Sequence, residues 1–336
     1  MTVEVPVHRR AAEPTRDATS APILVTGIPR AGTSWVGKML EAGGELVYIN
    51  EPLNPRHPPG QSPGVLRAPV SHRFQYISEA NEHLYLAPFK DTVAFRYHFR
   101  DELRRNRSVP DLLRMAQHST SFIYGRLCGR RALIDDPFAV FSAGWFARRL
   151  GCEVVIVVRH PAAVVGSRRR LGWRTDFASL LAQPLLMADW LEPYRDEMEA
   201  LLRVDDALGE AALLWKMIYG AVAKLRARHP ELHVVRHEDL SLEPVHEFAE
   251  LYRRLGMRFG EAAVRSIERA TTGGGRERRV AWSLSKTGLS RTAYRPLDSR
   301  ANATRWKSDL TAEELSRLRG LIGDAAAAFY GDHEWE

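Results

Sequence analysis

The chain has 336 residues, 45% of them apolar, which suits one large α/β domain with a buried core. Its formal net charge of +7 permits an anionic ligand, but its arginines are scattered among acidic residues, and no basic stripe is interleaved with aromatic side chains. We therefore expect no nucleic-acid partner, and the two cysteines disfavour both a disulfide framework and a cysteine-rich zinc site.

The first twenty residues are polar and charged and contain no apolar segment of the kind that secretory signals carry. We expect residues 1–20 to form a flexible tail and residues 21–334 to form the folded domain. No apolar run approaches the roughly 18 to 20 residues that a membrane-spanning helix needs. The sequence therefore predicts a soluble, cytoplasmic protein without a transmembrane segment.

Short apolar segments rich in β-branched residues alternate with helical patterns along the chain. The predicted strands are 22–27, 46–50, 132–135, 153–158 and 232–237. The predicted helices are 34–43, 101–118, 138–150, 161–170, 179–203, 209–228, 244–255, 261–270 and 311–330. This alternation is typical of βαβ units around a mostly parallel sheet, whose ligands bind beyond the carboxyl ends of the strands.

The first strand leads into a glycine-containing loop and a helix, over residues 22–38. The spacing of Gly27 and Gly32 and the hydroxyl of Ser34 match a Walker A phosphate-binding loop, but Thr33 stands where that motif has its lysine. A basic residue is present earlier in the loop, at Arg30. Because the Walker lysine contacts β- and γ-phosphates, we expect a nucleotide without them, bound by the loop amides and Arg30.

A second basic element follows the strand at 153–158. Arg159 ends this strand, Pro161 opens a helix, and Ser167 lies about two turns into that helix. An arginine and a hydroxyl group so placed can bind a phosphate separate from the one in the first loop.

Together these segments resemble the sulfotransferase family that uses 3′-phosphoadenosine 5′-phosphosulfate (PAPS), and are closest to its carbohydrate-type and bacterial members. PRAGTSW (29–35) resembles the 5′-phosphosulfate loop of that family, and RHPAAVVGS (159–167) resembles its 3′-phosphate element. RHEDL (236–240) and RWKSDLTAEE (305–314) are similar to two further segments of the family. The resemblance implies a P-loop-like single α/β domain of sulfotransferase type, with long acceptor and cofactor-covering loops.

The same resemblance implies a set of nucleotide-binding residues and no metal. It places the 5′-phosphosulfate on Arg30, Ala31, Gly32, Thr33 and Ser34, adenine on Trp35, and the 3′-phosphate on Arg159 and Ser167. From the residues alone, Trp35 is equally well read as a core residue. Segment 271–309 is expected to cover the nucleotide, with Ser299 and Arg300 matching the family best, although a disordered insert is the alternative.

The implied reaction moves a sulfuryl group to an acceptor oxygen and leaves 3′-phosphoadenosine 5′-phosphate (PAP). Arg30 would balance the charge on the departing phosphate. Glu51, in YINEPLN after the second strand, resembles the base of carbohydrate sulfotransferases, and His98 is the rival base. One residue departs from the family: Asp135 stands where relatives often have a lysine, and Arg126, Arg130 or segment 271–309 would have to supply another cation.

The acceptor itself is less well defined by the sequence. The Glu51 context favours a glycan, glycolipid or glycosylated natural product over a phenolic small molecule, with residues 51–130 lining the acceptor side. A P-loop kinase or nucleotidase, favoured only by the glycine spacing, and a catalytically inactive nucleotide-binding relative are the alternative functions. Nothing in the sequence indicates the oligomeric state.

Overall fold

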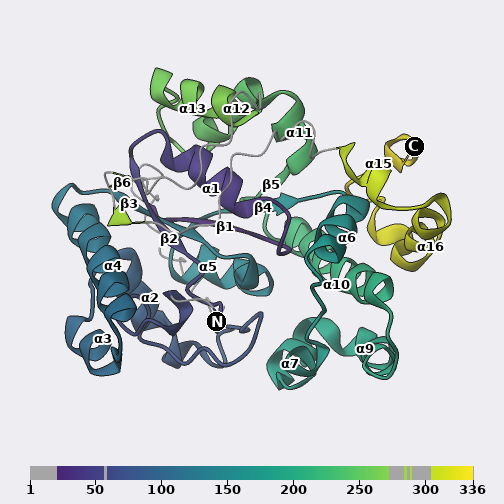
Figure 1. The fold of residues 1–336 in the computed structure, drawn as a ribbon, viewed down its shortest axis with the longest axis horizontal. Coiled ribbons are helices and arrows are strands. Elements are labelled where there is room, and N and C mark those ends of the chain that lie inside the picture. The colour runs from purple at the N-terminus through teal and green to yellow at the C-terminus, as the bar shows by residue number, and fades with distance from the viewer. Residues whose placement is uncertain (1–20, 57–58, 272–283, 286–287, 290–303, 336) are drawn as a thin grey trace, which may run out of the picture.

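The computed structural model describes residues 21–56, 59–271, 284–285, 288–289 and 304–335, and its centre is a five-stranded parallel sheet (Figure 1). The strands are β1 (Ile23–Gly27), β2 (Leu46–Asn50), β3 (Arg131–Asp135), β4 (Glu153–Val158) and β5 (His233–Arg236), in the order β2-β3-β1-β4-β5. All five agree closely with the predicted segments. The inner strands β1 and β3 are buried along their whole length, which is why they read as continuous apolar runs. The α/β fold class is confirmed.

Helices cover both faces of this sheet. In Figure 1, α1, α11, α12 and α13 lie on one side, and α5 and α10 lie on the other. The helices that match predicted segments most closely are α1 (Thr33–Glu41), α6 (Pro161–Arg170), α10 (Ala207–Arg228), α12 (Pro244–Arg254) and α13 (Glu261–Thr271).

Four predicted helices differ in the structure, mainly at proline and glycine. The segment 101–118 is two helices, α3 (Phe99–Arg105) and α4 (Val109–Leu127), because Ser108 caps a new start by accepting from the Asp111 amide. The segment 179–203 is divided at Pro184 and Pro193, which donate no backbone hydrogen bond. Its pieces are α7 (Phe177–Leu181), α8 (Pro184–Leu186), a π-helical turn (Met187–Leu191), a 3₁₀ turn (Glu192–Tyr194) and α9 (Arg195–Leu201).

The other two differences are shorter. The segment 138–150 begins with a 3₁₀ turn, Pro137–Ser142, before α5 (Ala143–Arg149). In the segment 311–330, α16 (Ala312–Ile322) ends at Gly323, which adopts a positive φ of 55°. The sequence patterns missed α2 (Leu86–Val93), α11 (His237–Leu242) and the short α15 (Trp306–Asp309).

Much of the segment 271–309 lies outside the described residues, and so do Ser299, Arg300 and the tail 1–20. Its described part includes the antiparallel pair β6 (Leu284–Ser285) and β7 (Gly288–Leu289), and β7 packs against α4. The tail, the acceptor-side insert and the covering segment remain predictions. Among the described helices, none is both long and apolar enough to cross a membrane.

Two buried aromatic residues of α10 hold the carboxyl ends of β1 and β4. The Trp215 indole Nε1 donates to the carbonyl oxygen of Arg159 at 2.9 Å. The Tyr219 hydroxyl donates to the carbonyl oxygen of Val157 at 2.9 Å and accepts from the Ile28 amide at 3.5 Å. Since both rings are fully buried, the loops after β1 and β4 start from fixed positions.

Candidate active site

The loop between β1 and α1 adopts a conformation that its glycines make possible. Gly27 has a φ of 154°, and a Cβ there would lie 2.5 Å from the Val157 carbonyl oxygen. Gly32 has a φ of 98°, and its Cβ would lie 2.6 Å from Nδ1 of His237. A side chain at either position would therefore displace a neighbouring strand or the buried His237.

Gly32 is also the residue that precedes α1, and no side chain caps this helix start. The helix dipole concentrates partial positive charge on the first amides of α1, where an anion is stabilised. Arg30, two residues earlier, has a φ of 83°, a strained conformation for a residue with a side chain. The loop therefore presents backbone amides and a guanidinium group to one place.

The two basic elements predicted from sequence meet at this loop. Arg30 Nε donates to Ser167 Oγ at 3.0 Å, and Arg159 Nη1 donates to the carbonyl oxygen of Arg30 at 2.9 Å. Burial lowers the pKa of Arg159, and the charge of Arg30 lowers it further. Burial also lowers the pKa of Arg30, with a second contribution from Arg170. A buried cation, Arg159, and an exposed one, Arg30, thus lie side by side, which favours an anionic ligand.

The RHEDL segment supports the turn after β4. Glu238 accepts from the backbone amide of His160 at 2.9 Å and from the Tyr330 hydroxyl at 2.8 Å, and burial raises its pKa. The His160 ring stacks on Trp306 with centroids 4.7 Å apart, and burial lowers its pKa to about 4. His160 is therefore neutral and packed against the residues that support this turn.

Trp35 lies in the core. Its side chain is 7% exposed, and its ring contacts His237 and Phe248 edge-on, with centroids 5.1 Å and 5.4 Å apart. The structure thus shows the core packing that was one reading of this residue, and stacking on adenine stays a prediction.

Glu51 follows β2 at the same edge of the sheet. Its backbone amide donates to the carbonyl oxygen of Asp135 at 2.7 Å, and its φ of 47° is positive. The carboxylate accepts from Asn54 Nδ2 at 2.6 Å. Burial raises the pKa of Glu51, while the Asn54 hydrogen bond and the nearby Arg73 charge oppose that rise. A half-buried carboxylate with a raised pKa suits a general base.

A model of the sulfotransferase family matches residues 22–261, which include both basic elements, Glu51 and the whole sheet. The chain belongs to this family. No curated protein matches it significantly.

Several solved sulfotransferase structures are similar to this sulfotransferase. The sulfotransferase domain from the curacin biosynthetic pathway has 14% identity and a TM-score of 0.45, over 90% of this chain and 97% of that one. The domain from the Synechococcus PCC 7002 olefin synthase has 16% identity and a TM-score of 0.43, over 96% and 99%. Mouse SULT7A1 complexed with PAP has 12% identity and a TM-score of 0.46, over 94% and 86%.

His98, the rival base, lies at the start of α3. Its Nε2 is 3.4 Å from Asp91 Oδ2, and its backbone amide donates to the Gly64 carbonyl oxygen at 3.1 Å. Within the part of the sulfotransferase that the structure describes, these contacts do not include Arg30 or Glu51. Its role as base remains a prediction.

Asp135 ends β3 and is fully buried. The Tyr48 hydroxyl donates to it, and the hydroxyls of Ser34 and Thr33 lie close enough to stabilise its charge. Burial nevertheless raises the pKa of Asp135 to about 6, and the Glu51 charge adds to that rise. Asp135 is therefore a buried acid whose contacts help to join β2, β3 and α1.

The sequence suggested Arg126 and Arg130 as cations in place of a lysine at position 135, but neither is among the groups that contact Asp135 in the described residues. Arg126 is exposed on α4, and Arg130 contacts the Tyr124 hydroxyl at 3.3 Å. The cation beside Glu51 is Arg73, from the long insert, which the motifs did not single out. Within the described ranges, no group of three His, Cys, Asp or Glu side chains is placed to hold a metal.

Asp135→Asn should stabilise the protein at pH 8 and not at pH 4. The folded-state pKa of about 6 exceeds that of an unfolded aspartate, so stability from this group is present at low pH and is lost as pH rises through 6. Because the pKa of Asp135 is raised from 3.8 to about 6, ionisation of this group lowers the free energy of unfolding by about 3 kcal/mol. Urea unfolding at both pH values measures the gain, and an equal gain at both would contradict the burial argument.

Proposed function

We propose that this sulfotransferase transfers a sulfuryl group from PAPS to a hydroxyl group of its acceptor. The observation that carries the proposal is the set of hydrogen bonds among Arg30, Ser167 and Arg159, which joins the two basic elements at the carboxyl ends of β1 and β4. A donor with a 5′-phosphosulfate and a separate 3′-phosphate has two anionic groups to match them.

The residues present fit such a nucleotide. The 5′-phosphosulfate would be held by Arg30 and the amides of Ala31, Gly32, Thr33 and Ser34, and the 3′-phosphate by Arg159 and Ser167. Among the described residues, Arg30 has a hydroxyl partner in Ser167 but no carboxylate partner. A guanidinium without an ion pair is suited to balance charge on the leaving phosphate.

The donor, when bound, supplies an activated sulfuryl group. The acceptor oxygen forms a bond to sulfur, the bond between sulfur and the bridging 5′-phosphate oxygen breaks, and the electron pair stays on PAP. Glu51 receives the proton of the acceptor hydroxyl. The Glu51 backbone is hydrogen-bonded to Asp135 and its carboxylate to Asn54, at the same edge of the sheet as the loops after β1 and β4. Such contacts would hold the carboxylate in position for the proton transfer.

For the acceptor, we favour a glycan, glycolipid or glycosylated natural product, because the YINEPLN context of Glu51 resembles carbohydrate sulfotransferases. A phenolic small molecule is the alternative. Sulfated products formed from a cell extract supplied with labelled donor, and analysed by mass spectrometry, distinguish the two.

Calorimetric titration with PAP tests the donor. We expect saturable binding of PAP in a buffer without metal ions, because Arg30 and Arg159 supply the positive charge that a metal provides elsewhere. No binding at millimolar PAP would overturn the proposal. Magnesium-dependent turnover of ATP would instead favour a kinase or nucleotidase, which the threonine at position 33 argues against.

A further inference from the structure

A small pocket, partly open to solvent, lies next to the proposed transfer site. Pro29, Arg73, Phe138, Arg168 and Trp173 are among the residues that line it. The Arg30 guanidinium lies 5.7 Å from the Trp173 ring centroid, and the charge of Arg73 acts on Glu51. The pocket therefore borders both the proposed leaving-group cation and the proposed base.

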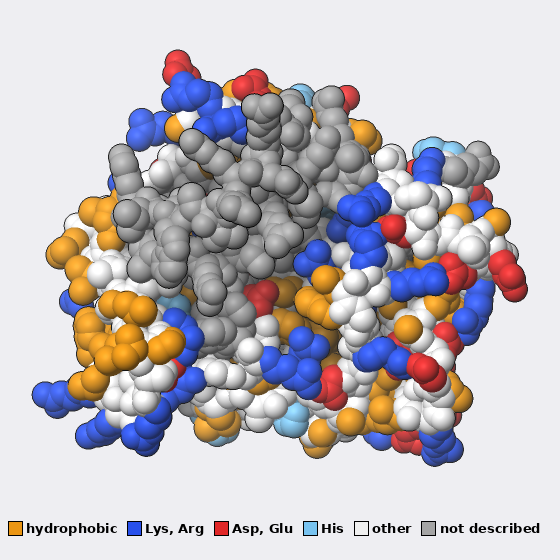
Figure 2. Space-filling model, in the orientation of Figure 1, with side chains coloured by type: hydrophobic (Ala, Val, Ile, Leu, Met, Phe, Trp, Pro, Cys, Tyr) orange, Lys and Arg blue, Asp and Glu red, His pale blue; other side chains and the backbone are white. Residues whose placement is uncertain are grey.

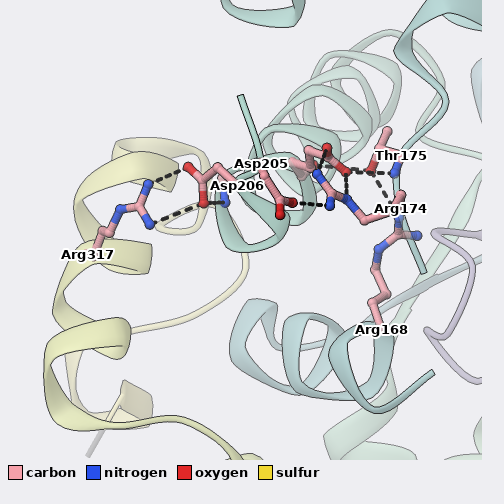
Figure 3. A network of polar contacts seen from close by, with 8 residues as sticks. Arg168, Arg174, Thr175, Asp205, Asp206 and Arg317 are labelled. Carbon is pink, nitrogen blue, oxygen red and sulfur yellow. Dashed lines mark hydrogen bonds and ion pairs between the residues drawn. The ribbon is translucent and has the colours of Figure 1, made fainter. Parts of the chain in front are cut away.

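Arg168 is buried at this pocket, with 4% of its surface exposed. Its Nη2 donates to Thr175 Oγ1 at 2.9 Å, and Figure 3 shows the side chain extending from α6 toward Thr175. Its buried Nε has no hydrogen-bond partner among the described residues. Burial, together with the smaller effect of the Arg73 charge, lowers the pKa of Arg168 to about 10. Arg168 thus carries a buried positive charge that is only partly satisfied.

Arg73 supplies a second guanidinium to the same pocket. Its Nε is also buried without a hydrogen-bond partner in the described part of the chain, and its Cζ lies 5.4 Å from the Phe138 ring centroid. The backbone around it is held in place: its amide donates to Ser179 Oγ at 3.1 Å, and its carbonyl oxygen accepts from Gln183 Nε2 at 3.4 Å. Arg73 is therefore positioned by α7 and the residues after it.

The carboxylates near these arginines are already used by other groups. Glu210 accepts from Arg174 at 2.9 Å and 2.5 Å and from the Thr175 amide at 2.9 Å. Asp176 accepts from Arg56 at 3.3 Å and from the Ser179 amide at 3.1 Å. Two cations that repel each other thus share a pocket in which neither forms an ion pair with a described carboxylate, although the charge of Glu51 acts on Arg73. An incoming anion would stabilise this arrangement.

Basic side chains are also visible from outside. Figure 2 shows Lys and Arg side chains gathered near α6, to the right of the grey atoms. Of the run Arg168–Arg170 at the end of α6, Arg169 and Arg170 face solvent while Arg168 turns into the protein. Arg169 and Arg170 form ion pairs with Glu314 and Asp309, so Arg168 is the arginine of this run that has no carboxylate partner among the described residues.

We propose that Arg73 and Arg168 bind an oxyanion group of the acceptor, so that this sulfotransferase modifies a hydroxyl group of an acidic molecule rather than of a neutral one. The inference rests on the proposed function, because it takes Glu51 and Arg30 as the transfer site. Guanidinium groups pair with carboxylates and phosphates through two parallel hydrogen bonds, which would fix the orientation of the acceptor. The aromatic rings of Phe138 and Trp173 supply apolar surface for the body of the molecule.

The test uses the full chain saturated with PAP and three probes of similar size: methyl β-glucuronide, glucose 6-phosphate and neutral methyl β-glucoside. Ligand-observed NMR titration gives each dissociation constant. We expect an acidic probe to bind at least about tenfold more tightly than the neutral one, the gain of one charge-assisted hydrogen bond. The first two probes distinguish a carboxylate from a phosphate ester.

The variants Arg73→Gln and Arg168→Gln should each remove this preference, and Arg253→Gln is the matched control. Arg253 is exposed on α12 and pairs with Glu250, so its loss changes the net charge equally but leaves the pocket intact. Arg73 is less buried than Arg168, so Arg73→Gln keeps the test valid should the other variant unfold. Equal binding of all three probes to the wild type, or a preference retained in Arg73→Gln, would overturn the inference. Failure of PAP to bind would instead overturn the proposed function.

Discussion

Glu51→Gln is expected to lower the turnover number by about 10²-fold or more, the usual contribution of a general base. The affinity for PAP should stay near that of the wild type, because Glu51 lies after β2 and has no contact with Arg30, Arg159 or Ser167 among the described residues. Glutamine is isosteric and still accepts from Asn54, so the loop geometry is retained. Steady-state kinetics with an acceptor identified from the labelled-donor experiment, together with calorimetric titration of PAP, measure both quantities.

The pH profile provides a second readout of the same prediction. A base must be ionised to act, so activity falls as pH decreases through its pKa. Because burial raises the pKa of Glu51, we expect the acidic limb of kcat/KM above 4.5, the ordinary glutamate value. That limb should disappear in Glu51→Gln. Glu41→Gln, which removes a partly buried glutamate paired with Lys38, is the control and should retain it.

Unchanged turnover in Glu51→Gln would assign the base to another residue. His98→Asn then becomes the decisive variant. A full loss of activity in it, with Glu51→Gln active, would place catalysis at the start of α3.

Arg159→Met is expected to weaken PAP binding by about 10²-fold, because it removes a charge-assisted hydrogen bond to the 3′-phosphate and leaves that charge unmatched. Binding of adenosine 5′-monophosphate, which lacks this phosphate, should change much less. The ratio of the two dissociation constants therefore isolates the 3′-phosphate. Methionine preserves the volume of the buried stem.

Arg159 also donates to the carbonyl oxygen of Arg30, so the variant can disturb the first loop. Ser167→Ala serves as the comparison, because it removes a hydroxyl group proposed to bind the same phosphate and keeps the hydrogen bond from Arg159 to the Arg30 carbonyl oxygen, although it removes the acceptor of Arg30 Nε. We expect it to weaken PAP binding by about tenfold, because it removes one hydrogen bond to an ionised phosphate but no positive charge. An equal loss for PAP and adenosine 5′-monophosphate in Arg159→Met would show that Arg159 acts on the loop alone.

The sheet and the glycine-containing loop after β1 were predictable because they depend on local patterns. Buried parallel strands are continuous apolar runs, and loops that bend at Gly27 and Gly32 need glycine for steric reasons that local sequence reflects. The helix boundaries near Pro184 and Pro193 were predicted less well, because periodicity was followed across residues that interrupt backbone hydrogen bonding.

The sequence by itself determined the fold class and the family, and it marked Arg30, Arg159 and Glu51 as candidate site residues. Only the tertiary structure decided which side chains share a surface: it joined Arg30 to Ser167, placed Arg73 beside Glu51, and buried Arg168 within a run of three arginines. The reason is that motifs and periodicity report on residues close in the chain. Burial and charge pairing depend on contacts between distant segments, which no local pattern contains.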